Sequence, residues 1–114
     1  MAGESADLLQ GTLGVLILRA LLGGRTHGYG VARWIEQSTG DVLRIEEGSL
    51  YPALRRLEDR RLVKSEWGVS ENNRRARFYS ITTAGRRHLT SESVQWLKFA
   101  GAVTAVLRTV PGVA

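Results

Sequence analysis

Apolar positions near the start of the chain recur at the spacing of an α-helix. Between residues 8 and 23 they fall at positions 9, 13, 16, 17, 20 and 21, so one face of a helix would be apolar. Gly23 and Gly24 follow, and glycine is common where helices end because it adopts left-handed backbone angles without strain. The pattern predicts a first helix over residues 8–23.

The next segment predicts a turn and a second helix. Residues 25–30, RTHGYG, predict a turn, and a helix follows over residues 29–38. Three side chains of this helix are expected to face a core: Val31, Trp34 and Ile35. Residues 39–41, TGD, break the helix, and the run VLRI at residues 42–45 predicts a short strand.

A third helix is marked by Leu50, Leu54 and Leu57, which are spaced i, i+4, i+7. Proline has no backbone N–H, so Pro52 is expected among the first few positions of this helix, where an N–H has no acceptor within the helix. Ser49 is the predicted N-cap because its hydroxyl can accept a hydrogen bond from an N–H group of the first turn.

A hairpin and a long helix complete the pattern. Residues 62–67 and 76–82 alternate in polarity, which is typical of strands, and the asparagines at 72–73 tolerate the backbone angles of a tight turn. Trp67 and Phe78 are expected to pack in the core or the hairpin. From residue 83 a helix is predicted to run towards residue 110, where proline and glycine end it.

Composition limits the classes of protein that fit this pattern. A chain of 114 residues with 43% hydrophobic and 24% charged residues is expected to form one domain with a modest core. The absence of cysteine excludes disulfides, thiolate nucleophiles and Cys-based zinc sites, and it fits a cytoplasmic location. Residues 1–7 lack the pattern of a signal peptide. The apolar stretches 8–22 and 99–110 are shorter than the ~20 residues of a membrane span, so no membrane partner is expected.

The net charge of +5 is concentrated in the middle of the chain. Residues 44–87 hold eleven Lys or Arg against six Asp or Glu, whereas residues 1–43 have a balance of −1 and residues 88–114 a balance of +1. Ten of those eleven cations are arginines, whose planar guanidinium matches phosphates and guanine edges. A localised basic surface of this kind favours a polyanionic partner over a surface charged only for solubility.

Residues that would support an enzyme are sparse. His27 and His88 are the only histidines, the carboxylates are scattered, and no spacing typical of metal ligands occurs, so no metal or cofactor is expected. Ser49 and the distant His27 do not define a catalytic triad. The glycines of residues 23–30 lack the strand-to-helix context of a phosphate-binding loop.

The order helix, helix, strand, helix, hairpin, helix is that of a winged helix-turn-helix with an added C-terminal helix. The expected fold class is therefore mostly α with a small β-hairpin wing. Four motifs resemble the PadR family of bacterial winged-helix repressors: HGYG at 27–30, EEGSLYPALRRLE at 46–58, WGVSENNRRARFYSIT at 67–82 and TTAG at 82–85. The match extends over residues 8–107, and the short C-terminus resembles the subfamily with a single C-terminal helix.

The resemblance implies a DNA-binding domain over residues 8–83, between a flexible N-terminus (1–7) and a C-terminal dimerisation helix with its tail (84–114). The third helix would enter the major groove of double-stranded DNA, and the wing would follow the backbone or the minor groove. The implied DNA contacts are Tyr29, Ser49, Tyr51, Pro52, Arg55, Arg56, Asn73, Arg74, Arg75 and Arg77. Arg55 is the first candidate for a guanine contact, followed by Arg56.

A simpler interpretation exists for some of these residues. Arginines at 55, 56, 60 and 61 could form an exposed face paired with Glu58 and Asp59, which fits Arg60 and Arg61 best because they lie at the far end of the helix. Tyr29 could likewise pack beneath the wing.

The last helix predicts a partner. Positions 89, 93, 96, 100, 103, 107 and 110 form a heptad-like seam with one polar residue. A chain of 114 residues has little with which to cover both this seam and the first helix, so a two-fold homodimer is expected, as the PadR resemblance also implies. Packing of the seam within one chain is the alternative. The predicted interface residues are Leu9, Leu13, Leu89, Trp96, Val103 and Leu107.

Trp96 matches the tryptophan with which some PadR-like proteins bind flat aromatic compounds at the dimer centre. A small aromatic or amphiphilic effector is therefore a candidate partner, with Leu8, Val15, Arg19, Glu92, Trp96 and Ala100 as its predicted contacts. Arg19 and Glu92 could instead pair across the gap and fill it, in which case Trp96 only packs the dimer.

The sequence thus predicts a cytoplasmic, homodimeric repressor that binds an inverted-repeat operator, and release by an aromatic or amphiphilic effector is a candidate mechanism that the sequence leaves open. Two alternatives remain: a winged helix used for protein contacts, and architectural DNA binding without sequence preference. The first alternative would place acidic or mixed residues on the exposed face of the third helix, whereas this helix offers arginines.

Overall fold

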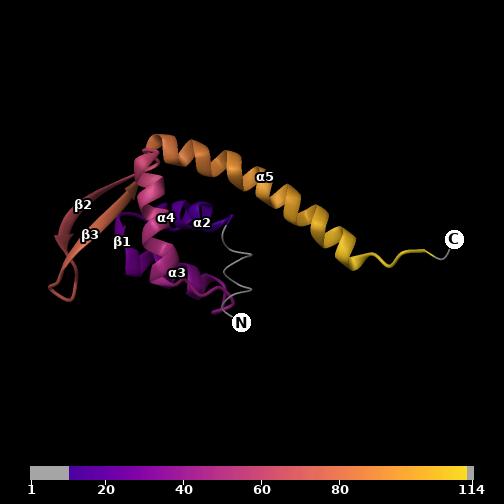
Figure 1. Ribbon diagram of the computed structural model, residues 1–114, viewed down its shortest axis with the longest axis horizontal. Helices are drawn as coiled ribbons and strands as arrows, with labels where there is room; N and C mark the ends of the chain where they lie inside the picture. Colours follow the sequence, from indigo (N-terminus) through magenta and orange to yellow (C-terminus); the bar gives the residue numbers. More distant parts are fainter. Residues whose placement is uncertain (1–10, 113–114) are drawn as a thin grey trace.

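The computed structural model describes residues 11–112 (Figure 1). Helices α2, α3 and α4 and a three-stranded antiparallel sheet form the body, and the long helix α5 projects from it. The elements are α2 Leu13–Leu21, β1 Thr26–His27, α3 Gly28–Ser38, α4 Glu47–Asp59, β2 Val63–Val69, β3 Arg75–Ile81 and α5 Thr83–Arg108. This is the winged helix-turn-helix that the sequence predicts.

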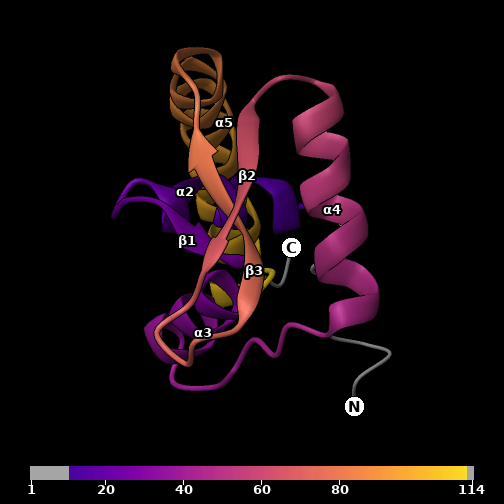
Figure 2. The same ribbon diagram turned by 90° about the vertical axis from the view of Figure 1, so that its left-hand side faces the viewer.

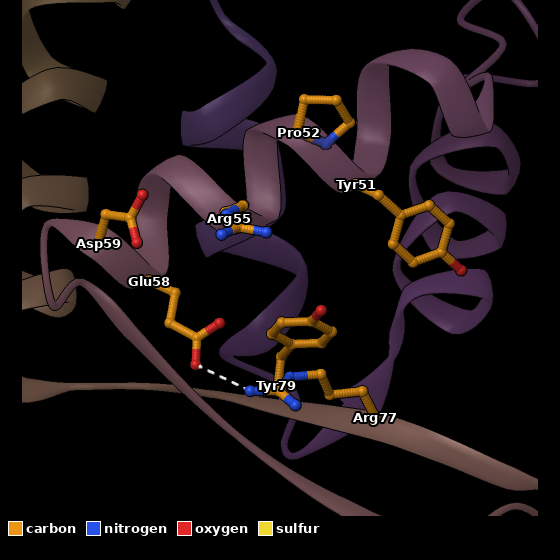
Figure 3. A pocket seen from close by; sticks show the side chains of 7 residues that line it. All are labelled: Tyr51, Pro52, Arg55, Glu58, Asp59, Arg77 and Tyr79. Carbon is orange, nitrogen blue, oxygen red and sulfur yellow. Dashed lines mark hydrogen bonds and ion pairs between the residues drawn. The ribbon is translucent and has the colours of Figure 1, made fainter.

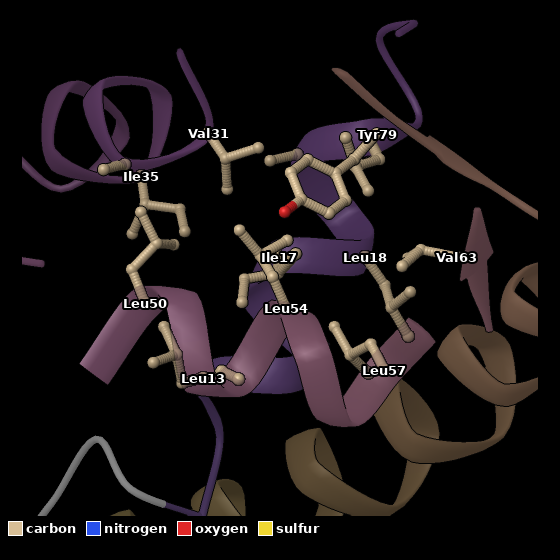
Figure 4. Close-up of a cluster of buried hydrophobic side chains, with 14 of the residues drawn as sticks. Leu13, Ile17, Leu18, Val31, Ile35, Leu50, Leu54, Leu57, Val63 and Tyr79 are labelled. Atoms are coloured by element: carbon tan, nitrogen blue, oxygen red, sulfur yellow. The ribbon is translucent and has the colours of Figure 1, made fainter. Parts of the chain in front are cut away.

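The core forms where α2 packs against α3 and α4 (Figure 4). The leucine stripe of α4 points into it, and Leu50, Leu54 and Leu57 are all buried, as predicted. Ile17 and Leu18 of α2 have no exposed surface. Trp34 does not face the core, contrary to the prediction, and 45% of its surface is exposed. The inward stripe of α3 is instead taken by other residues: Gly28, Val31, Ala32, Ile35 and Glu36.

The loop between α3 and α4 is not the predicted strand. Ile45 donates its backbone N–H to the Glu36 carboxylate at 2.9 Å, and Leu43 donates to the Thr39 hydroxyl at 3.1 Å. The side chains of Glu36 in α3 and of Thr39, its C-cap residue, therefore satisfy N–H groups that a strand would offer to a neighbouring strand. The Nε atom of Arg44 also lies 3.8 Å from the Glu36 carboxylate. Glu36 is buried, with only 8% of its surface exposed.

Besides the two hairpin strands, the sheet contains the short strand β1, which forms in the segment predicted to be a turn. It pairs with β3 at the two positions Thr26↔Tyr79 and His27↔Phe78, so β3 is the middle strand of the sheet. His27 also caps α3, because its Nδ1 atom accepts the Gly30 N–H at 3.0 Å. The start of α3 and the edge of the sheet are thus fixed by one residue.

Helix α4 begins two residues before Ser49, so Ser49 is not its N-cap. Glu46 holds the cap position, and its carbonyl accepts the N–H groups of Ser49 and Leu50. Pro52 consequently stands at the sixth position of the helix rather than within the first turn. Because proline has no N–H, the Gly48 carbonyl four residues earlier receives no hydrogen bond from it.

The predicted hairpin is confirmed, with β2 and β3 paired from Val63↔Ile81 to Val69↔Arg75. Asn73 has φ 58° in the turn, a left-handed conformation that asparagine adopts more easily than most residues. Directly opposite residues share a face of the sheet. One face therefore carries Ser65, Trp67, Arg75, Arg77 and Tyr79, and it looks towards α4, because Arg77 and Tyr79 line a cleft with residues of that helix.

Helix α5 is anchored to the body at its beginning by hydrogen bonds. The Thr82 hydroxyl accepts the Gly85 N–H at 3.0 Å and donates towards the Arg61 and Leu62 carbonyls at 2.8 and 3.0 Å. Leu89 is buried, but most of the helix beyond it is exposed and extends away from the body (Figure 1). Within residues 11–112, no helix is both long and apolar enough to cross a membrane.

Candidate nucleic-acid interface

The outer face of α4 is basic and lies beside the hairpin (Figure 2). Its inner face is buried in the core, which turns Tyr51, Arg55 and Arg56 outwards. Within residues 11–112 neither Arg55 nor Arg56 forms an ion pair. The interpretation in which the α4 arginines pair with Glu58 and Asp59 therefore finds no support in that part of the chain.

A cleft of about 800 Å³ separates α4 from the sheet (Figure 3). Its lining combines cations, carboxylates and phenol rings: Tyr51, Pro52, Arg55, Glu58, Asp59, Arg77 and Tyr79. The predicted contacts Tyr51, Pro52, Arg55 and Arg77 are thus brought together, although 26 residues separate the first from the last in the sequence. The cleft is the junction between the helix and the wing of the fold.

Burial alters one titratable group of this cleft. Tyr79 is only 6% exposed, and this burial raises the pKa of its phenol above the usual value. Arg77 acts in the opposite direction, because a nearby cation favours the phenolate, whereas Glu58 and Tyr51 add to the increase. Tyr79 thus remains a neutral phenol at physiological pH, with its hydroxyl directed towards α4 (Figure 3).

Arg77 is held against α4 rather than projected from the hairpin. Its Nη2 atom lies 3.5 Å from Oε2 of Glu58, and its Nε donates to the Ser65 hydroxyl at 2.8 Å. The Ser65 hydroxyl in turn donates to the same Glu58 oxygen. Glu58 and Ser65 were not among the predicted site residues, because nothing in the sequence indicates a contact across these distances.

The other wing arginines lie nearer the hairpin turn. The Arg75 guanidinium carbon is 4.5 Å from the centroid of the Trp67 ring, within the range of cation–π attraction. Trp67 is 55% exposed, so it packs within the hairpin surface and not in the core. Arg74 and Asn73 are exposed in the turn itself.

The opposite face of the sheet carries an arginine that the sequence did not single out. Arg25 lies 4.1 Å above the Phe78 ring, and its Nε is 2.9 Å from the Glu66 carboxylate. The His27 ring meets the same phenylalanine edge-on at 5.5 Å. This cluster fastens the loop before β1 to the hairpin, and its polar members are exposed or partly exposed.

The remaining predicted DNA residues are accessible. Tyr29 is 67% exposed at the start of α3, so it does not pack beneath the wing. Ser49 is exposed within the first turn of α4. Tyr51 rests on α3, because a Cβ atom at Gly28 would lie 2.9 Å from its ring. Glycine at position 28 therefore allows the Tyr51 ring of α4 to approach the first turn of α3 closely.

The predicted interface residues on α5 differ in their accessibility. Trp96, Val103 and Leu107 are 46%, 40% and 79% exposed, so no part of residues 11–112 covers them fully. The alternative in which the seam packs within the chain therefore fails for the distal half of α5, as far as the described residues show. Leu13 and Leu89 are each 4% exposed in the core and add little surface to an interface. Leu9 lies outside the described residues.

A second cavity, of about 600 Å³, lies between α2 and α5. Its lining is mainly apolar: Thr12, Val15, Leu16, Arg19, Leu43, Ser93, Trp96 and Leu97. Three of the predicted effector contacts, Val15, Arg19 and Trp96, line it, whereas Glu92 and Ala100 do not and Leu8 lies outside the described residues. The ion pairs of residues 11–112 do not include Arg19 with Glu92, so that pair does not fill the cavity.

The sequence matches a known family over most of its length. The family is described as the Transcriptional regulator PadR-like family, and residues 17–91 match it. These residues include α3, α4 and both strands of the hairpin.

Solved structures share the whole arrangement. A transcriptional regulator from Clostridium thermocellum is 28% identical, covering 87% of this chain and 96% of that protein, with a TM-score of 0.78. A PadR family transcriptional regulator from Eggerthella lenta is 30% identical, covering 96% of this chain and 93% of that one, with a TM-score of 0.76.

A protein of Lysinibacillus sphaericus, described as uncharacterized, is 28% identical over 91 residues, or 80% of this chain and 84% of its own length.

Proposed function

The chain belongs to the PadR-like family of transcriptional regulators, and we propose that it is a repressor that binds an inverted-repeat operator as a homodimer. A transcriptional regulator is not an enzyme, and DNA is the partner that the family supports. The finer proposal rests above all on the exposed arginines of α4, Arg55 and Arg56, which make no ion pair within residues 11–112. Repression would follow from occupying DNA that the transcription machinery needs.

The roles of the α4 residues follow from their positions. With the leucine stripe in the core, the outer face of α4 is free to enter a major groove. Arg55 would bind a guanine edge through two parallel hydrogen bonds, and Arg56 is the next candidate. Ser49 and Tyr51 would bind phosphates or base edges, and Pro52 would contact the groove wall beside them.

The wing would contribute contacts that position the helix without reading sequence. Asn73, Arg74 and Arg75 are exposed at or next to the turn, where they can reach a phosphate backbone or a narrow minor groove. Tyr29 would reach a phosphate from the start of α3. Arg77 belongs to the same proposed surface, although Glu58 engages it in the free chain.

Homodimer formation is supported by the apolar side chains that α5 leaves exposed. Trp96, Val103 and Leu107 belong to one seam, and a second copy of this helix could cover them around a two-fold axis. Residues 8–83 would then bind DNA and residues 84–114 would hold the two copies together. Two recognition helices about 34 Å apart would require an inverted repeat.

An effector site is supported by the cavity between α2 and α5. Its walls are mostly apolar with few polar groups, which suits a flat aromatic or amphiphilic compound beside Trp96. Such a compound would release the operator only if it bound more tightly to a dimer whose recognition helices no longer fit the groove.

Fluorescence anisotropy tests the proposal. The gene's own upstream DNA and a scrambled duplex would each be titrated across a salt series. We expect tighter binding to the upstream DNA and a steep decrease of affinity with salt. Equal affinity for both duplexes would favour an architectural binder or a different target promoter. No binding at low salt would favour the alternative of a winged helix used for protein contacts.

A further inference from the structure

Glu58 lies where α4 meets both strands of the hairpin (Figure 3). Ser65 of β2 donates its hydroxyl hydrogen to Oε2 of Glu58, and Arg77 of β3 brings Nη2 to 3.5 Å from the same atom. Arg77 Nε closes the ring by donating to the Ser65 oxygen at 2.8 Å. Three elements are thus joined by three side chains.

The ring of Glu58, Ser65 and Arg77 connects α4 to the hairpin strands through polar side chains. Within residues 11–112, each polar side-chain contact between α4 and the hairpin strands ends on Glu58. The side chains of Arg77 and Glu58 are 41% and 33% exposed, so water reaches both. An ion pair as exposed as this one contributes little to folding. Its main consequence is therefore the position and the effective charge of Arg77.

The same contact sets Arg77 apart from the neighbouring arginines. Within the described residues, Arg55, Arg56, Arg74 and Arg75 form no ion pair, so their charges are available to an approaching phosphate. A phosphate that approaches the Arg77 guanidinium must either break its contact with Glu58 or come close to that carboxylate, which repels it. DNA of arbitrary sequence would lack the base contacts of α4 that favour this exchange.

We propose that Glu58 is a specificity-determining residue that restrains Arg77 and thereby lowers the affinity for DNA of arbitrary sequence. The inference rests on the proposed DNA binding. Affinity for arbitrary sequence comes almost entirely from phosphate contacts, each of which releases condensed counterions. Withholding one arginine from such contacts weakens this background without altering the residues of α4 that read bases. Glu58 acts through Arg77 and touches no base itself.

The test compares Glu58→Gln with the unaltered protein on a scrambled duplex across a salt series. Freeing Arg77 should add one phosphate contact, which steepens the slope of log K against log salt by about 0.9 and raises affinity about eightfold at 0.1 M salt. Asp59→Asn is the matched control, because Asp59 lines the same cleft and forms no ion pair within residues 11–112. It removes the same charge but should leave the slope unchanged.

A second change separates release of Arg77 from a general loss of negative charge. In the double variant Glu58→Gln/Arg77→Gln the slope should return to that of the unaltered protein, because the extra contact comes from Arg77. A slope that stays steep in the double variant, or one that does not change in Glu58→Gln, would overturn the inference. Melting temperatures of all variants verify that each remains folded.

The pairing can also be measured without DNA. In NMR spectra, the Arg77 Nη2–H protons, which face Glu58, should exchange slowly with water in the unaltered protein and rapidly in Glu58→Gln. Rapid exchange in both would overturn the inference even if DNA binding is confirmed. If the unaltered protein binds no duplex at low salt, the proposed DNA binding fails, and this inference fails with it. If the protein binds DNA but the slopes do not differ, only this inference fails.

Discussion

The Cα atom of Gly85 faces the carbonyl oxygen of Leu62 so closely that a Cβ atom there would lie 2.1 Å from it. Only glycine fits at this point, where the first turn of α5 meets the segment that leads from α4 into β2. A backbone carbonyl cannot move aside as a flexible side chain can. The position of α5 on the body therefore depends on this contact.

Gly85→Ala should destabilise the fold. Forcing a methyl group against a backbone carbonyl costs about 1–3 kcal/mol, the usual range for an overpacked site. Chemical denaturation followed by circular dichroism would measure the loss. Gly101→Ala is the control, because no atom lies within 4 Å of a Cβ there and alanine favours a helix by about 1 kcal/mol over glycine. Equal stability of the two variants would mean that α5 does not depend on the contact.

Arg55→Ala should relax the preference for one base pair of the operator. Losing a two-point contact to guanine costs about 1–3 kcal/mol of discrimination at that position. Competition binding with single-base operator variants would measure it. Arg60→Ala, at the C-terminal end of α4, should leave the order of preference among those variants intact. If Arg55→Ala weakened all sequences equally, base reading would have to be assigned elsewhere.

Arg74→Ala should weaken binding to all duplexes alike. Its guanidinium is exposed in the wing turn, and losing one phosphate contact reduces the slope of log K against log salt by about one. Titrations of operator and scrambled duplexes across a salt series would detect this change. Arg108→Ala, at the far end of α5, should keep the original slope. An unchanged slope for Arg74→Ala would exclude that side chain from the phosphate contacts.

Val103→Glu should separate the two copies of the proposed homodimer. It places a charge within the apolar seam of α5, where a partner helix would have to bury it without a counter-ion. Analytical ultracentrifugation would then show a monomer at concentrations where the unaltered protein is dimeric. Ala105→Glu adds the same charge on the other side of the exposed helix and should leave the dimer intact. A Val103→Glu dimer would show that the seam is not the interface.

Tyr79 should make folding stability depend on pH in the alkaline range. Burial raises the pKa of its phenol in the folded chain, so the unfolded chain loses the proton first as pH increases. The contribution of the neutral Tyr79 phenol to the free energy of unfolding is therefore fully present below about pH 10. Above that pH the free energy of unfolding decreases by up to about 1.4 kcal/mol per pH unit. Comparing Tyr79→Phe with the unaltered protein by thermal denaturation from pH 8 to 11 would show this. Parallel pH profiles would argue against the shift.

The sequence predicts most of the helices and the hairpin because local rules fix them. The spacing of the leucines in α4 is visible within a short stretch of sequence, and Asn73 supplies the left-handed angle that a tight turn requires. Strand β1 has only two residues, which is too short for any alternation to be visible. The strand predicted at residues 42–45 fails because Glu36 and Thr39 satisfy its backbone, an outcome that depends on how α3 is placed.

The candidate site shows the same division. The arginines of α4 and the wing can be selected from residue type and motif alone. Which of these arginines forms an ion pair cannot be predicted in this way, because the contact between Glu58 and Arg77 joins positions 19 residues apart. Trp34 illustrates a different error: the sequence predicts that this aromatic residue faces the core, whereas the structure leaves it exposed and buries the polar Glu36.

Thr82 gives α5 the geometry of a lever. One hydroxyl group joins the start of this helix to the carbonyls of Arg61 and Leu62, in the segment between α4 and β2. The helix beyond is 26 residues, or about 39 Å, long. A rotation of about 5° at Thr82 would move the far end of such a rod by about 3 Å. Conversely, a molecule that shifts the distal end of α5 would rotate the helix about its beginning at Thr82. In the proposed homodimer, a small adjustment in how the two α5 helices cross would therefore change the separation of the two proposed DNA-binding domains.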